Sequence, residues 1–148
     1  MPPPALTIRP IAAGEEKDVI AIWTACGLTR PWNDPDNDLA FARGKENSDV
    51  LVGLADGEIV AAVMVGHDGH RGTMYYVGVR PDLQKTGYGR TLVAAAEAWL
   101  KSKGIWMVNL LVRSGNEKVL GFYASLGYGA NSAQSLEKWI DPAKRGDA

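Results

Sequence analysis

The chain has 148 residues, a formal net charge of −1 and a single cysteine. A chain of this length suits one domain that buries roughly two thirds of its unfolded surface, so we expect a single domain over residues 1–148, with an ordered core over residues 5–140 and short tails. The Lys and Arg residues form no basic stripe, which argues against a nucleic-acid partner. One cysteine excludes an internal disulfide, and no apolar run approaches the ~20 residues of a membrane span. We therefore expect a cytoplasmic protein with no membrane partner.

Hydrophobic periodicity and turn residues predict an alternation of strands and helices, which corresponds to a mixed sheet flanked by helices. Asp56-Gly57, between two apolar runs, is a strong hairpin signal. The expected elements are, in chain order, a strand over 6–11, helices over 14–27 and 38–43, strands over 50–54, 59–65 and 74–79, a helix over 92–103, a strand over 106–112, a helix over 119–126 and an edge strand over 134–139. Apolar residues at periodic positions, which we expect to pack in the core, include Trp23, Cys26, Trp99 and Trp106.

The segment 79–92 joins the end of a predicted strand to the start of a helix. Gly87 and Gly89 remove two side chains, so that successive backbone N–H groups can point into one concavity, and the helix adds the positive end of its dipole. Such a turn binds phosphate. A Walker loop is excluded because Arg90-Thr91 stands where a Lys-Ser or Lys-Thr pair is required, and a dinucleotide fingerprint is excluded because Leu92 occupies the position of its third small residue.

Three segments in chain order together resemble the GCN5-related N-acetyltransferase (GNAT) superfamily. Val79-x-Pro81-x-x-Gln84-x-x-Gly87-x-Gly89 resembles its pyrophosphate loop, Asn116 follows the next strand as in the family, and Phe122-Tyr123-x-x-x-Gly127-Tyr128 resembles its second motif. More narrowly, residues 30–35 and 68–76 resemble the uncharacterised bacterial YpeA-like branch. The resemblance implies an α/β (α+β) acyl-CoA N-acyltransferase fold with a mostly antiparallel twisted sheet, and an N-acetyltransferase that uses acetyl-CoA and no metal.

The resemblance also implies which residues hold the CoA. Backbone N–H groups of the loop would bind the pyrophosphate, and the preceding strand would pair with the pantetheine arm as an added strand does. Asn116 would hydrogen-bond the arm, although a lone Asn also suits the cap of the next helix. The side chain of Arg90 either assists or is a solvated charge. The implied CoA-binding residues are Val77, Val79, Gln84, Lys85, Thr86, Gly87, Tyr88, Gly89, Arg90 and Asn116.

Acyl transfer to an amine requires that the amine lose a proton, that the carbonyl oxygen gain charge, and that the departing thiolate take a proton. The resemblance implies direct transfer in a ternary complex, with a backbone N–H near Val77 at a strand bulge for the oxyanion and Tyr123 as the acid. Tyr123 also fits a core position. The strand 74–79 contains no carboxylate, so the candidate proton acceptors are His70, Asp68 or a water chain. Their glycine-rich loop equally suits a plain turn, and its histidines lack a third metal ligand.

The acceptor would be a small-molecule amine or a peptide N-terminus, and the family often forms homodimers. Trp32 and Asn33, with Asp34, suit either a site for a cationic amine or a turn. Tyr75 and Tyr76 are predicted to point to opposite faces of the sheet, which would place one of them at the acceptor. The candidate acceptor-binding residues are therefore Trp32, Asn33 and Tyr75. A non-catalytic acyl-CoA-binding or sensing module is the alternative function.

Overall fold

The computed structural model describes residues 2–145. Contacts between Cα atoms divide the chain into two compact units, Met1–Leu110 and Leu111–Ala148. Within the described residues, the first unit holds a four-stranded sheet and three α-helices, and the second holds one α-helix. No helix among residues 2–145 combines the length and the apolar composition that crossing a bilayer requires.

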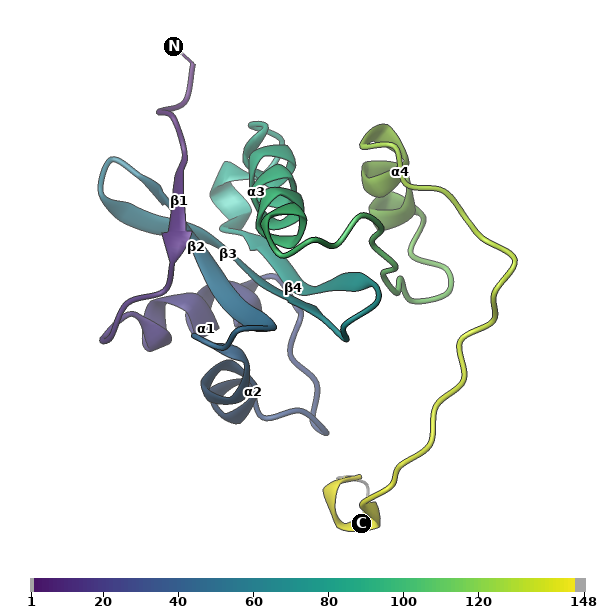
Figure 1. Ribbon diagram of the computed structural model, residues 1–148. Coiled ribbons are helices and arrows are strands. Elements are labelled where there is room, and N and C mark those ends of the chain that lie inside the picture. Colours follow the sequence, from purple (N-terminus) through teal and green to yellow (C-terminus); the bar gives the residue numbers. More distant parts are fainter. Residues whose placement is uncertain (1, 146–148) are drawn as a thin grey trace. The chain divides into compact units, whose positions relative to one another are not determined.

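The sheet of the first unit has the order β1-β2-β3-β4, and each strand is antiparallel to its neighbour (Figure 1). Asp56 and Gly57 connect β2 to β3 with φ of 51° and 76°, the left-handed pair of a type I′ hairpin turn, which confirms the predicted hairpin. The four strands are Thr7–Pro10 (β1), Ser48–Ala55 (β2), Glu58–His67 (β3) and Gly72–Val79 (β4).

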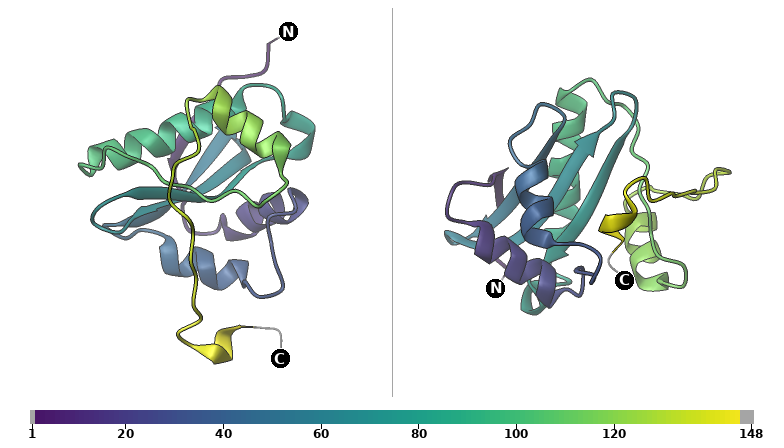
Figure 2. Two further views of the ribbon diagram at one scale, coloured as in Figure 1. Left: turned by 90° about the vertical axis from the view of Figure 1, so that its right-hand side faces the viewer. Right: turned by 90° about the horizontal axis from the view of Figure 1, so that it is seen from below.

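Helices cover both faces of this sheet (Figures 1 and 2). On one face α1 (Glu16–Ala25) lies against β3 and β4, and α2 (Pro35–Ala42) lies against β2 and β3, whereas α3 (Tyr88–Ser102) lies on the other face against β3 and β4. The predicted helices are confirmed, and α2 and α3 begin earlier than expected. The apolar core under α1 and α2 contains Val19, Trp23, Leu39, Val50, Val52 and Ala62.

Residues 106–112 are not the regular strand that alternation predicts. They meet β4 at a single parallel bridge between Gly72 and Val108, where the Gly72 N–H donates to the Met107 oxygen and the Asn109 N–H donates to the Gly72 oxygen, both at 2.9 Å. The ladder does not continue, because β4 is bulged further along and its outward-facing backbone groups lose the spacing that a neighbouring strand needs.

The tryptophans differ in environment. Trp23 is fully buried, as predicted. Trp99 is only half-buried. Trp106 is 74% exposed with the Arg71 guanidinium 4.4 Å from its ring centre, so the prediction that it packs in the core is wrong. Without a regular strand over 106–112, alternation does not direct its side chain into a core.

The second unit contains α4, Glu117–Ser125, in the place where a helix is predicted. Its N-cap is Asn116, and the left-handed Gly127, with φ of 94°, follows its end. Residues 134–139 do not form the predicted edge strand, because alternation of residue types makes a strand only where a neighbour supplies the ladder.

Two short 3-10 turns, η1 (Pro81–Leu83) and η2 (Pro142–Lys144), complete the elements of the described residues.

A substitution at Gly72 tests how closely β4 packs against α3. A Cβ atom at Gly72 would lie 2.6 Å from Leu100 Cδ1, and Leu100 is itself buried. Gly72→Ala should therefore lower the free energy of unfolding by about 1–3 kcal/mol, measured in urea. Gly121→Ala on α4 is the matched control, because nothing lies within 4 Å of its added Cβ, and it should stabilise the helix by about 0.5–1 kcal/mol. Equal effects of the two substitutions would contradict this packing.

Candidate functional site

β4 carries a β-bulge at Tyr76. The pairing of β4 with β3 shifts between Ala62 and Met64, so that Tyr76 and Val77 together face one residue of β3. Tyr76 has φ of 57°, a left-handed conformation that costs a bulky residue roughly 1–3 kcal/mol. The bulge that the family resemblance implies near Val77 is therefore present.

The bulge changes which backbone groups of β4 point to its outer edge, the edge away from β3. Gly72 points outward, because its N–H and C=O bond to residues 107–109. Val79 also points outward, because its C=O accepts hydrogen bonds from two side chains while the following N–H bonds back to β3. Every second residue shares a direction in a regular strand, so Gly72 and Val79, seven apart, can both point outward only with one extra residue between them. The N–H of Val77, two residues before Val79, therefore points outward too.

The same bulge brings Tyr75 and Tyr76 to one face of the sheet, so the prediction that they face opposite sides is wrong. Tyr75 pairs with Met64, whose side chain packs against the core under α1 and α2, and cross-strand pairs share a face. Tyr76 belongs to the same core and stacks on Trp23 of α1, with ring centroids 4.3 Å apart. The ring of Tyr75 is 49% exposed at this face.

The hydroxyl group of Tyr76 is bound to α2. It donates a hydrogen bond to Oδ2 of Asp38 at 2.7 Å. Burial, followed by the neighbouring Asp38 carboxylate, raises the pKa of Tyr76 well above its ordinary value, so the hydroxyl keeps its proton at neutral pH and acts as a donor. One aromatic side chain thus connects the bulge to both helices of this face.

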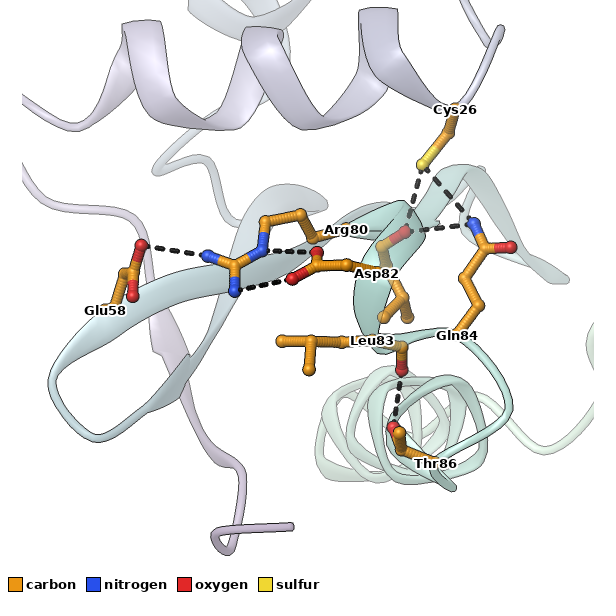
Figure 3. A network of polar contacts seen from close by, with 8 residues as sticks. Cys26, Glu58, Arg80, Asp82, Leu83, Gln84 and Thr86 are labelled. Carbon is orange, nitrogen blue, oxygen red and sulfur yellow. Dashed lines mark hydrogen bonds and ion pairs between the residues drawn. The ribbon is translucent and has the colours of Figure 1, made fainter.

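After β4 the chain turns through η1, and Arg80 fixes that turn (Figure 3). The guanidinium donates to Asp82 from Nε at 2.7 Å and from Nη2 at 3.2 Å, and to Glu58 from Nη1 at 2.8 Å. Arg80 holds the pKa of Asp82 below its usual range. Because Glu58 begins β3, this ion pair ties the turn to the sheet.

The Gln84 side chain folds back onto the end of β4 (Figure 3). Its Nε2 donates to the Val79 oxygen at 3.1 Å and lies 3.9 Å from the sulfur of Cys26, whose thiol donates to the same oxygen at 3.1 Å. Burial raises the pKa of the Cys26 thiol. Cys26 is half-buried rather than a full core residue, because it lies at the end of α1 against this backbone oxygen. The Gln84 N–H itself bonds to the Pro81 oxygen at 3.4 Å.

The chain from Gln84 to α3 contains two left-handed residues. Lys85 has φ of 64° and Gly87, the N-cap of α3, has φ of 91°. Between them, the Thr86 hydroxyl donates to the Leu83 oxygen at 2.5 Å. This alternation of backbone conformation suits a concave nest of N–H groups.

α3 differs from the other α-helices of the described residues in its first turn. α1, α2 and α4 each have an acidic residue there, whereas α3 has none, and no side chain caps its N-terminus. The Thr91 N–H bonds to the Gly87 oxygen at 3.1 Å, and helix geometry leaves the preceding N–H groups, including those of Tyr88 and Gly89, without an acceptor inside the helix. Their positive potential, with no acid beside it, favours an anion at this point.

The side chains of this first turn take different positions. Tyr88 is buried, 4% exposed, and its hydroxyl donates to the Pro4 oxygen at 2.6 Å. Its side chain therefore packs inside the protein, and its hydroxyl joins the N-terminal segment to α3. Arg90 lies exposed at the surface.

The hairpin between β3 and β4 holds Asp68 and His70. Oδ1 of Asp68 accepts hydrogen bonds from the N–H groups of His70 and Arg71 at 2.9 and 2.8 Å, and the N–H groups of Arg71 and His70 lower the pKa of this carboxyl. This is the turn role that the sequence left open. β4 runs for eight residues from this hairpin to Val79, a span of about 23 Å, so the structure does not bring Asp68 and His70 to the loop after β4.

Trp32, Asn33 and Asp34 lie in the loop between α1 and α2. The Asn33 N–H donates to the Arg30 oxygen at 3.0 Å, and Asp34 is the N-cap of α2, accepting from the Asp36 N–H at 3.0 Å. Asp34 therefore has a structural role as a helix cap, which differs from the turn that the sequence offers as one of two possibilities. Trp32 is 43% exposed.

Asn116 and Tyr123 belong to the second unit. Oδ1 of Asn116 accepts from the Val119 N–H at 3.3 Å, so the capping role is present, and its amide Nδ2 is the donor that a ligand would use. Tyr123, on α4, makes edge-to-face contacts with Phe122 and Tyr128 at 5.1 and 5.5 Å between centroids. Burial raises the pKa of Tyr123 to about 12.

Two features escaped sequence reasoning. The sequence pattern places Asp38 in a short helix and does not reveal that it binds Tyr76. It also does not reveal that the Gln84 side chain binds the Val79 oxygen. No short-range pattern could reveal the first contact, since its partners lie 38 residues apart. Within residues 2–145, no group of three or more His, Cys, Asp or Glu side chains is arranged to hold a metal ion.

The sequence is similar to a described family and to curated bacterial proteins. The model of the acetyltransferase (GNAT) family matches residues 17–128. An acetyltransferase of Yersinia enterocolitica is 37% identical over 133 residues, which cover 90% of this chain and 94% of that protein. An acetyltransferase of Pectobacterium atrosepticum is 39% identical over 123 residues, covering 83% of this chain and 87% of that protein.

The fold is also similar to solved structures. The structure of AAC(6')-Iy in complex with a bisubstrate analogue, CoA-S-monomethyl-acetylneamine, has a TM-score of 0.78 at 14% sequence identity, covering 91% of this chain and 98% of that one. At this identity the likeness concerns the fold alone.

Cys26 reports on the contact between α1 and the end of β4, because it is the single cysteine of the chain. Its half-burial and its raised pKa leave little accessible thiolate at pH 8. Cys26 should therefore react with Ellman's reagent at least about tenfold more slowly than glutathione, and unfolding in urea should remove the difference. A folded-state rate equal to the unfolded one would show that the thiol is not held against Val79.

Proposed function

Because the chain belongs to the acetyltransferase (GNAT) family, we propose that it transfers an acetyl group from acetyl-CoA directly to an amine in a ternary complex. Family membership and the relatives, which are named acetyltransferases, support acyl transfer in general. The observation that supports the specific proposal is the succession of three elements along the chain. These are the bulged strand β4, the turn η1, and the N-terminus of α3, which has neither a side-chain cap nor an acidic residue in its first turn. We take residues 1–148 as one catalytic domain, since the family match runs through both units.

The CoA pyrophosphate would bind to the nest between Gln84 and α3. The proposed donors are the backbone N–H groups of residues 85–90, supported by the dipole of the 15-residue helix α3. Gln84, whose N–H is used within the turn, contributes through its side chain by holding the loop against β4. Charge-assisted hydrogen bonds to backbone N–H groups are roughly twice as strong as neutral ones, which suits a doubly charged ligand.

The pantetheine arm would pair with the outer edge of β4. Val77 and Val79 both point their N–H groups to this edge, and within the described residues the only bridge on it is at Gly72, at the other end of the strand. The Val79 oxygen already accepts two hydrogen bonds from side chains, so its N–H is the group left for the arm. An extended amide chain adds to such an edge as a further strand. On the family resemblance, the Nδ2 amide of Asn116 would add a donor.

Two groups would act on the thioester. The N–H of Val77 would stabilise negative charge on the carbonyl oxygen as the amine nitrogen attacks the carbonyl carbon, a type of interaction that is worth 10²–10³-fold in rate. On the family resemblance, the Tyr123 hydroxyl would give its proton to the sulfur as the C–S bond breaks, so that CoA leaves as a thiol and the tyrosinate takes a proton back from water. The pKa of about 12 keeps Tyr123 protonated, and therefore able to donate, at neutral and moderately alkaline pH.

The proton of the amine would leave to water. β4 contributes no carboxylate, and the Asp68–His70 hairpin precedes Gly72, roughly 16 Å of strand away from the Val77 N–H that would face the thioester. The acceptor would be a small-molecule amine or a peptide N-terminus that approaches over the face of α1 and α2, where Tyr75, Trp32 and Asn33 are candidate contacts.

Incubation with acetyl-CoA and a panel of amines tests the proposal. The panel contains polyamines, amino acids, aminoglycosides and peptides with free N-termini, and mass spectrometry detects the acetylated product alongside free CoA. We expect product from at least one class. Tight binding of acetyl-CoA without any acetylated amine would favour the non-catalytic acyl-CoA-binding alternative.

Gly89→Val should separate CoA binding from folding. A β-branched side chain in the first turn of α3 would block the approach of the pyrophosphate to the N–H groups of the nest. Loss of two charge-assisted bonds of about 1.5 kcal/mol each weakens acetyl-CoA binding on the order of 100-fold, measured by calorimetry. Ala94→Val, on an exposed position of the same helix, is the matched control and should bind normally. Equal affinities of wild type and Gly89→Val would remove the loop from the CoA site.

Tyr123→Phe should lower kcat by about 10²-fold, the scale of a lost general acid, while the dissociation constant of acetyl-CoA stays within threefold. Because the pKa of Tyr123 is raised to about 12, the wild-type rate should show no decline with an apparent pKa near 10. Tyr128→Phe, which removes a neighbouring hydroxyl from the same aromatic group, should leave kcat unchanged. An unchanged rate for Tyr123→Phe would exclude this residue as the acid.

A further inference from the structure

Tyr76 is an unusual residue at the position it occupies. Three non-glycine residues of the described chain have positive φ: Asp56 in a hairpin turn, Lys85 in the loop before α3, and Tyr76 within a strand. A tyrosine avoids this conformation, because its Cβ crowds the backbone. Contacts made by its side chain must therefore hold it there.

Two such contacts come from different helices. The Tyr76 ring lies on the Trp23 indole of α1, with 20° between the planes, and the hydroxyl reaches Asp38 on α2 at 2.7 Å. The first contact fixes the plane of the ring and the second fixes its far end. Both lie on the face of the sheet that α1 and α2 cover.

The conformation of Tyr76 decides where Val77 points. With the bulge, the Val77 N–H points to the outer edge of β4, as does that of Val79. Without it, alternation from Gly72 would turn the Val77 N–H inward to β3 and place that of Tyr76 on the edge. A change at one residue would thus remove the donor that faces the thioester.

We propose that Asp38 and Tyr76 are positioning residues of the acyl transfer, whose hydrogen bond holds the bulge and so aims the Val77 N–H at the thioester carbonyl. This inference rests on the proposed function. Neither side chain needs to touch the reacting atoms. Asp38 on α2 accepts the hydrogen bond. Because this bond holds Tyr76 in its left-handed conformation, it also sets the direction of the next N–H, that of Val77.

The test uses variants that remove the hydrogen bond from either side. Tyr76→Phe keeps the ring on Trp23 and loses the donor hydroxyl, Asp38→Ala loses the acceptor carboxylate, and the double variant loses both. Asp36→Ala is the matched control, because it removes the same charge from an exposed position of α2. Tyr76→Phe alone decides the question if Asp38→Ala does not fold.

The readout is the infrared carbonyl band of acetyl-CoA labelled with ¹³C at the carbonyl, which requires no acceptor amine. Bound to the wild type, the band should lie at lower frequency than in buffer, because the Val77 N–H polarises the carbonyl. Tyr76→Phe and Asp38→Ala should each lose at least half of this shift, the double variant no more than either, and Asp36→Ala none. The dissociation constant of acetyl-CoA should change less than threefold. With an amine that the wild type acetylates, kcat should fall about tenfold in both variants, as expected from a displaced catalytic group.

The outcomes separate the two claims. A wild type that does not bind acetyl-CoA overturns the proposed function and this inference with it. Binding with a shifted band that Tyr76→Phe leaves unchanged overturns the positioning role alone. An unchanged band in Asp38→Ala, together with a much larger loss of kcat than in Tyr76→Phe and loss of the acidic limb of the pH profile, identifies Asp38 as a proton acceptor instead.

Discussion

The left-handed conformation of one residue, Tyr76, governs the arrangement around it. At this bulge β4 has one residue more than β3 opposite it. The backbone groups after the bulge therefore point to the edge of β4 opposite to the one that regular alternation would give. Residues 107–109 bind the edge before the bulge, and the edge after it is the one that would pair with the CoA arm in the proposed function. The stack on Trp23 and the hydrogen bond to Asp38 offset the backbone strain.

The turn after β4 is fixed in a similar way, by contacts to the sheet and to α1. Arg80 binds Glu58 at the start of β3, and the Gln84 amide covers the last oxygen of β4 beside Cys26. These contacts hold the backbone that leads into α3. In the proposed function they would lower the entropy cost of binding, because an ordered loop loses less freedom than a mobile one does.

The sequence predicted what short-range patterns determine, and it missed what distant contacts determine. Asp56-Gly57 encodes its turn locally, and the apolar stripe of α3 encodes its helix. Residues 106–112 form an apolar run of the kind that a buried strand has, yet a ladder needs a partner in register, and the bulge removes it. The same bulge places Tyr75 and Tyr76 on one face of the sheet, where alternation predicts opposite faces. The bond between Tyr76 and Asp38 joins residues 38 apart, which no local pattern encodes.

The central claim is that one acyl-CoA molecule binds along the outer edge of β4 and at the first turn of α3. Titration of ¹⁵N-labelled protein with acetyl-CoA, followed by amide chemical shifts, tests it most directly. The account predicts that the largest changes fall on Val77, Val79 and residues 85–90, while the amides of the hairpin at residues 68–71 stay unchanged. Changes confined to that hairpin, or none at residues 77–90 at saturation, would contradict it.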